Sequence, residues 1–311
     1  FAVFVSSVVK DPSMRRILCL FVLCCLLVAT GSARATDDMN AVAERYAHLV
    51  LALGQHDPDY VDAFYGPAEW KTQAEKEKKS LDAIGAEAAE LLKKLRVERT
   101  AVPLIESSDA GNSGDEILKL RREYLQKQIS ALAVRVRMLK GEKLKFDAES
   151  RALYDAVAPT YRQSGSDPDS HFDGIIKQLE TKSPGKGPLW KRYENWRKPF
   201  VIPKEKLDTV FQLAIKECRA RTLAHVALPP NESFTVEYVT NKPWGGYNWY
   251  KGNFHSVIQV NTDLPIFIDR AVDLAAHEGY SAHHVYNSLL EKYLVRAPGL
   301  VEFSVYALFF P

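Results

Sequence analysis

The chain has 311 residues, of which 46% are hydrophobic and 26% are charged, a composition typical of a globular protein that buries a large core. Its formal net charge is +2, and residues 1–35 alone carry +3, so the rest of the chain carries −1. A near-neutral chain lacks the excess of basic residues that binds phosphate backbones, which argues against a nucleic-acid partner.

The first 35 residues have the pattern of an export signal. Two arginines precede the apolar run Ile17 to Ala29, and Ala33-Arg34-Ala35 then forms a small-residue cleavage site. We therefore expect an exported protein, either periplasmic or secreted. The apolar run is short for a transmembrane helix, so we expect membrane association only if the signal segment stays uncleaved.

This signal divides the chain into three parts. Residues 1–13 precede the first methionine and are expected to be upstream translation that is not part of the protein, and residues 14–35 are expected to be the signal peptide. Residues 36–311 show no repeat or linker and are expected to form a single, mainly helical domain. Cys218 is the only cysteine left in that part, so no disulfide can form within the mature chain.

Amphipathic helices are predicted over most of residues 39–227. Apolar residues recur at helical spacing, and the clearest stripe consists of Leu81, Ile84, Ala88, Leu91, Leu92 and Leu95. A second stripe is aromatic and is predicted to face the core; it consists of Trp190, Tyr193, Trp196 and Phe200. The predicted helices span residues 39–55, 68–99, 117–139, 147–158, 171–179 and 203–227.

From Glu232 onward the apolar period changes from helical to alternating. Strands are predicted at residues 234–239, 247–250 and 254–261, and together they would make a small antiparallel sheet. The next apolar run, Ile266 to Ala276, predicts a buried helix beside this sheet. Thr262 or Asp263 would cap that helix, with Pro265 in its first turn.

Residues 277–284, His-Glu-Gly-Tyr-Ser-Ala-His-His, place three imidazoles and a carboxylate at the end of this helix. Neutral imidazole is the commonest zinc ligand, and a nearby carboxylate can take a proton from zinc-bound water. The familiar arrangement, H-E-x-x-H, puts both histidines on one helix face. Here the second histidine comes six or seven residues after His277, so the helix must be distorted if both are to reach one metal ion. Gly279 and Ser281-Ala282 are small enough to permit a bulge.

The motif leaves the second ligand open between two neighbours. Two residues inserted into H-E-x-x-H would make His283 the equivalent of the second histidine. We favour His277 with His283 as the zinc ligands and keep His284 as the alternative, with Glu278 as the catalytic base.

The motif resembles the H-E-x-x-P-G-H-H signature of a bacterial family catalogued as domain of unknown function 885. Residues 59–67, Asp-Tyr-Val-Asp-Ala-Phe-Tyr-Gly-Pro, also resemble a subgroup of it, although a helix cap followed by aromatic core explains them more simply. The resemblance implies a mainly α, helical zincin-like protein that binds zinc and hydrolyses peptides. It also implies a downstream glutamate as third ligand, which here is either Glu302 or a residue beyond Pro311. Because bulky Phe303 follows Glu302, we expect Glu302 either to be structural or to contact the metal ligands without binding the metal itself.

The expected function is that of an exported zinc-dependent metallopeptidase, in which Glu278 activates a zinc-bound water. Tyr247, Tyr250 and His255 of the predicted strands are candidates for holding substrate or an oxyanion, and a purely structural hairpin is the alternative. Two other functions remain open. One is a non-catalytic exported binding protein on the same scaffold, favoured by Ser281-Ala282 where the family has Pro-Gly. The other is a zinc hydrolase of another amide or ester. The sequence does not specify the oligomeric state.

Overall fold

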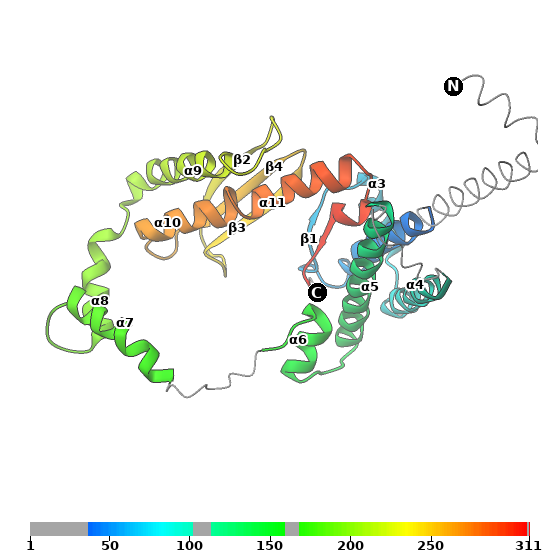
Figure 1. Ribbon diagram of the computed structural model, residues 1–311, viewed down its shortest axis with the longest axis horizontal. Helices are drawn as coiled ribbons and strands as arrows, with labels where there is room; N and C mark the ends of the chain where they lie inside the picture. The colour runs from blue at the N-terminus through cyan, green and yellow to red at the C-terminus, as the bar shows by residue number, and fades with distance from the viewer. Residues whose placement is uncertain (1–36, 102–112, 159–167, 310) are drawn as a thin grey trace, which may run out of the picture.

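A computed structural model describes residues 37–101, 113–158, 168–309 and 311 (Figure 1). The predicted signal peptide, its cleavage site and residues 1–13 lie outside the described residues. The chain is mainly helical with two small sheets, as predicted. The helices are residues 37–53, α3 (Ala68–Glu77), α4 (Leu81–Ala101), α5 (Ser113–Leu139), α6 (Phe146–Tyr154), α7 (Pro168–Lys182), α8 (Leu189–Arg197), α9 (Leu207–Leu223), α10 (Ile268–Leu274) and α11 (His283–Leu290).

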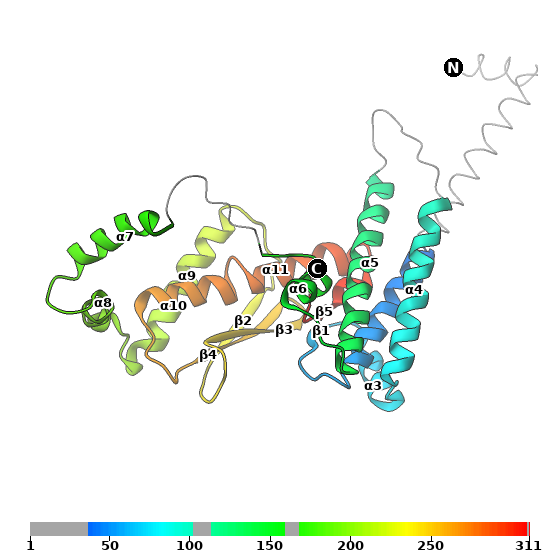
Figure 2. The same ribbon diagram turned by 90° about the horizontal axis from the view of Figure 1, so that it is seen from below.

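One hydrophobic core lies among the N-terminal helices. The long helices α4 and α5 lie side by side and pack with the helix over residues 37–53 (Figure 2). The predicted stripe of α4 is confirmed, because Ile84, Leu91 and Leu95 are fully buried. Each fully buried leucine or isoleucine contributes about 1.5–3 kcal/mol of transfer free energy, so this stripe accounts for much of the attraction between the helices.

A two-stranded antiparallel sheet ties the two ends of the described chain together. Strand β1 (Val61–Phe64) pairs with β5 (Val305–Ala307), with Phe64 opposite Val305. Within the stretch that contains β1, Tyr60 is 1% exposed and belongs to the helical core, in line with the aromatic-core interpretation. The sheet places residues 61–64 close to the C-terminal elements that carry the histidine motif.

A second sheet has three strands in the order β2-β4-β3, namely β2 (Ser233–Val239), β4 (His255–Asn261) and β3 (Gly246–Gly252). Strands β3 and β4 form an antiparallel hairpin whose two loop residues, Asn253 and Phe254, both have positive φ, as a type I′ turn requires. Strand β2, however, pairs with β4 in parallel. The sheet is therefore mixed, and the prediction of a purely antiparallel sheet was wrong on this point. The reason is that β2 and β3 run in opposite directions but are not neighbours: β4 lies between them, pairs antiparallel with β3 and therefore runs parallel to β2.

The second hydrophobic core lies between this sheet and the helices α9 and α10. It contains Phe211 of α9, Ile258 and Val260 of β4, and Leu274 of α10, all at most 4% exposed. The sheet and α10 thereby form one packed body, from which the histidine motif continues toward α11 (Figure 1).

Two predictions about local packing were wrong. The aromatic stripe that begins in α8 does not face a core, since Trp190 is 65% exposed and Trp196 is 44% exposed. The ring of Trp196 instead contacts those of Tyr193 and Phe200. Helix α10 begins at Ile268, after Phe267, and no side chain caps it. The expected caps are engaged elsewhere: Thr262 Oγ1 donates to the carbonyl oxygen of Val239, and the Asp263 carboxylate accepts from the amide of Asn241.

Candidate metal centre

The helix that carries His277 is distorted and then broken. After α10 the chain continues as one π-helical segment, η3 (Ala275–Gly279), leaves helical geometry at Tyr280, and starts α11 at His283. Ala282, which precedes α11, has φ −115° and ψ −112°. The distortion expected from the six-residue spacing is therefore present, and it takes the form of a π segment followed by a turn.

This break brings His277, Glu278 and His283 together. One potential ligand atom from each lies within 4.8 Å of those of the other two, and the two imidazole rings are 4.9 Å apart between centroids. No other such group of three metal-binding side chains is found among the residues that the structure describes. Both histidines are exposed and Glu278 is buried, so the group opens to solvent from the histidine side.

The surroundings of the group shift two protonation equilibria. Burial raises the pKa of the Glu278 carboxyl above its usual range, and the neighbouring His277 opposes this only in part. For His283, desolvation of the ring lowers the pKa, and nearby His277 lowers it further. A lowered pKa keeps the imidazole neutral at neutral pH, which is the form that binds a metal ion.

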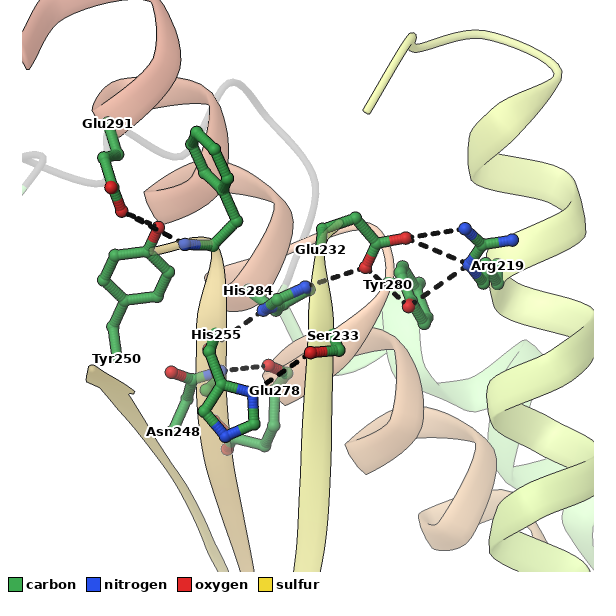
Figure 3. Close-up of polar contacts among 12 residues, drawn as sticks. Arg219, Glu232, Ser233, Asn248, Tyr250, His255, Glu278, Tyr280, His284 and Glu291 are labelled. Carbon is green, nitrogen blue, oxygen red and sulfur yellow. Dashed lines mark hydrogen bonds and ion pairs between the residues drawn. The ribbon is translucent and has the colours of Figure 1, made fainter. Parts of the chain in front are cut away.

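Strand β3 holds Glu278 in place. Asn248 Nδ2 donates to the carbonyl oxygen of Glu278 at 2.6 Å (Figure 3). A Cβ on Gly246 would lie 3.2 Å from Glu278 Oε1 and 2.6 Å from Leu274 Cδ2, so glycine allows the strand to approach the carboxylate closely. Sheet, π segment and carboxylate thus pack as one unit.

His284, the alternative ligand, lies outside the group. Its ring is fully buried, and Nε2 donates to Glu232 Oε2 at 3.0 Å. Because a carboxylate only accepts hydrogen bonds, Nε2 carries the proton and Nδ1 accepts from Ser256 Oγ at 2.9 Å. Both ring nitrogens are therefore engaged by the protein, whereas His283 is exposed and its ring lies against that of His277.

Glu302 also lies outside the group. Its side chain is fully buried and accepts two hydrogen bonds from Arg121 of α5, one from Nε at 2.6 Å and one from Nη2 at 3.1 Å. This placement agrees with the expectation that Glu302 is structural.

The three candidate substrate-binding residues are dispersed. Tyr247 donates its hydroxyl to Asp62 of β1, whose charge acts on the pKa values of both His283 and Glu278. Tyr250 donates its hydroxyl to Glu291 Oε2 at 2.5 Å in a buried contact, and His255 contacts Ser233 Oγ. Of the three, Tyr247 is therefore the one tied to the surroundings of the His277 group.

Sequence reasoning missed the partners of these residues. Glu232 and Arg121 are single charged residues within ordinary strand and helix patterns, and only their burial reveals a role. Asp62 lay within the stretch that resembles the family, which was a usable signal.

The π segment packs so closely on the sheet that it requires glycine at residue 279. A Cβ there would lie 2.9 Å from Cζ of Phe234, and an aromatic ring cannot bend away. We expect Gly279→Ala to lower the free energy of unfolding by about 1–3 kcal/mol, the usual cost of overpacking. Thermal denaturation measures this. Gly174→Ala in α7 is the control: its Cβ would meet nothing within 4 Å, so it should leave stability unchanged or raise it. Equal losses in both variants would contradict the packing argument.

Comparison with known proteins finds no matching family model, and no curated protein or solved structure matches the chain. Among the described helices, none combines the length and the apolar character needed to cross a bilayer.

Proposed function

We propose that this protein is an exported zinc-dependent metallopeptidase whose centre is formed by His277, Glu278 and His283. The observation that carries the proposal is the convergence of these three side chains at a break in the helix. The π segment and the turn bring two exposed imidazoles next to a buried carboxylate, and π-bulges in helices are frequent at functional sites.

The donor set fits zinc. Zinc commonly takes imidazole ligands, and in hydrolases with the H-E-x-x-H arrangement a carboxylate beside two such ligands acts as the base. His277 and His283 would hold the ion. When bound, zinc would polarise a carbonyl oxygen and lower the pKa of a water molecule at this site.

Glu278 is suited to act as the base. Its carboxyl is buried and has a raised pKa, so it accepts a proton more readily than an exposed glutamate. Asn248 and Gly246 fix its position from strand β3. Glu278 would take a proton from the attacking water and return it to the leaving amine.

The substrate class follows from the resemblance of residues 277–284 and 59–67 to the zinc-peptidase-like family, and the export from the signal at residues 14–35. A peptide would approach from the exposed histidine side. Tyr247, held by Asp62, is the strand residue best placed to contact it.

Zinc content tests the proposal. The purified protein should hold about one zinc ion per chain, the usual stoichiometry of a single catalytic site. His277→Ala and His283→Ala should each reduce this to well below one, because each removes a ligand. His284→Ala tests the alternative ligand: in the proposed centre it removes a donor to Glu232 and not a ligand, so it should weaken zinc binding less than His283→Ala does. Zinc content unchanged in both the His277 and the His283 variants would refute the proposed centre.

A further inference from the structure

Glu232 is a buried carboxylate that gathers four hydrogen bonds just before strand β2. Its side chain is fully buried. Oε1 accepts from Arg219 of α9, at 3.0 Å from Nε and 2.7 Å from Nη2, and Oε2 accepts from the Tyr280 hydroxyl at 2.7 Å and from His284 Nε2 at 3.0 Å (Figure 3). A carboxylate with this many donors is strongly held in one orientation.

Two of these donors flank the break in the helix. Tyr280 is the first residue after the π segment, and His284 is the second residue of α11. Phe234 packs against both rings, at 5.0 Å from Tyr280 and 5.1 Å from His284 between centroids, and the Tyr280 and His284 rings are 5.6 Å apart. Ser256 of β4 binds the other side of the His284 ring. The two ends of the turn are thus fixed to the sheet through a single carboxylate.

The turn between Tyr280 and His284 has few stabilising contacts within itself. Ser281 is exposed and Ala282 is partly exposed, and neither residue has a side chain that fixes its own φ. Without the fixed φ of proline, the shape of the turn depends on contacts outside it. Within the turn, the amide of Ala282 donates to the carbonyl oxygen of Ala276 at 3.2 Å, which is long.

His283 comes from this turn. His283 and His284 are successive residues of one helix, about 100° apart around its axis, so an inward His284 directs His283 outward. Fixing Tyr280 and His284 therefore fixes the direction in which His283 leaves the backbone, toward His277.

We infer that Glu232 is a positioning residue that sets the shape of the 280–284 turn and thereby the place of His283 relative to His277. The inference rests on the proposed metal centre for its functional consequence, but the fixing of the turn is independent of any metal.

Glu291 offers a matched control. It is also a buried carboxylate, 5% exposed, that accepts from a tyrosine hydroxyl and pairs with an arginine, in this case Tyr250 and Arg296. It also accepts the amides of Asn253 and Phe254 in the hairpin turn. Replacing it therefore removes a comparable buried network without touching the 280–284 turn.

The experiment compares Glu232→Met with Glu291→Met, since methionine keeps much of the length of glutamate but accepts no strong hydrogen bond. Zinc dissociation constants are measured by competition with a chelator. Hydrogen–deuterium exchange is measured on the metal-free proteins. We expect Glu232→Met to weaken zinc binding about tenfold or more, as loss of residues that orient metal ligands usually does, and to speed exchange over residues 280–286. Glu291→Met should bind zinc nearly as the wild type does and speed exchange only near residues 252–254 and 291–296.

A second pair of variants, each with a smaller change, keeps the test valid if the methionine variants misfold. Tyr280→Phe removes one donor to Glu232 and also the hydroxyl that accepts from Arg219 Nε, and Tyr250→Phe removes the equivalent donor to Glu291. Tyr280→Phe should weaken zinc binding about two- to tenfold, the effect of one hydrogen bond, and Tyr250→Phe should not. Exchange over residues 280–286 that is unchanged in both Glu232→Met and Tyr280→Phe overturns the inference, as does equal weakening of zinc binding by the Glu291 and Tyr250 variants. If the wild type binds no zinc, the proposed function fails, and the exchange data alone still decide whether Glu232 fixes the turn.

Discussion

Glu278→Gln should abolish peptide hydrolysis while leaving zinc bound. The amide has nearly the shape of the carboxyl and can keep the packing against Gly246, but it cannot accept a proton from water. Loss of a general base lowers the rate about 10²- to 10⁴-fold. Turnover of a peptide library by the zinc-loaded wild type and variant measures this, with zinc content determined on the same samples.

The zinc measurement separates two roles for Glu278. Retained zinc with lost turnover identifies a base, whereas lost zinc identifies a third ligand alongside His277 and His283. Unchanged turnover would contradict both roles. A zinc-loaded protein that cleaves no peptide in its wild-type form would instead favour a binding protein or a hydrolase of another amide or ester.

Stability of the metal-free protein provides the folding control. Because the folded-state pKa of Glu278 is raised, ionising it costs stability as pH rises through its unfolded and then its folded pKa. Above that window the wild type has lost this contribution, and Glu278→Gln, which does not ionise, has not. We therefore expect metal-free Glu278→Gln to be at least as stable as the wild type at neutral pH, so lost turnover cannot be ascribed to unfolding.

The histidine motif shows which features of the site could be predicted from the sequence and which could not. The spacing from His277 to His283 demanded a distorted helix, and the π segment with its turn meets that demand. Yet the choice between His283 and His284 depends on what each ring contacts. Only the fold, which brings Ser256 and Glu232 to His284 from residues 28 and 52 positions away, shows that His284 is engaged and His283 is not.

Long-range pairing limited the prediction of the fold in the same way. Periodicity located the stripe of α4 and the strands β2, β3 and β4, because those patterns are local. It did not predict β1, a strand of four residues whose partner lies more than 240 positions later, nor the parallel pairing of β2 with β4. The aromatic stripe of α8 shows the converse: a local pattern predicts a buried face only if another element covers it.

The contacts of Glu302 support the structural role expected for it from the sequence. The carboxylate and Arg121 form a bidentate ion pair, and both side chains are at most 4% exposed. The pair joins α5 to the segment just before β5, where Phe303 packs against Tyr124 of α5 and accepts a hydrogen bond from Tyr65 at its carbonyl oxygen. We expect this ion pair to hold the C-terminal segment on the helical core.

Glu302→Gln and Arg121→Met should each destabilise the protein by about 3–5 kcal/mol, because each leaves one buried polar or charged group without its partner. For a chain of this size that corresponds to a fall in Tm of roughly 5–9 °C. The double variant Arg121→Met/Glu302→Met should recover much of the loss, since apolar side chains of similar volume can replace a buried ion pair at little cost. Denaturant unfolding of the wild type, Arg121→Met, Glu302→Met and the double variant completes the double-mutant cycle, with Glu302→Gln measured beside it.

The control for this cycle is an ion pair on the surface. Arg221 and Glu217 of α9 lie 2.7 Å apart but are largely exposed, so Glu217→Gln should barely change stability. Zinc affinity is the second measurement. Glu302 is directed at Arg121 and lies outside the group of His277, Glu278 and His283. If its role is structural, the folded fraction of the Glu302→Gln variant should therefore bind zinc as the wild type does. Loss of zinc from folded Glu302→Gln, together with normal zinc binding by folded Arg121→Met, would identify Glu302 as a ligand and overturn the structural role.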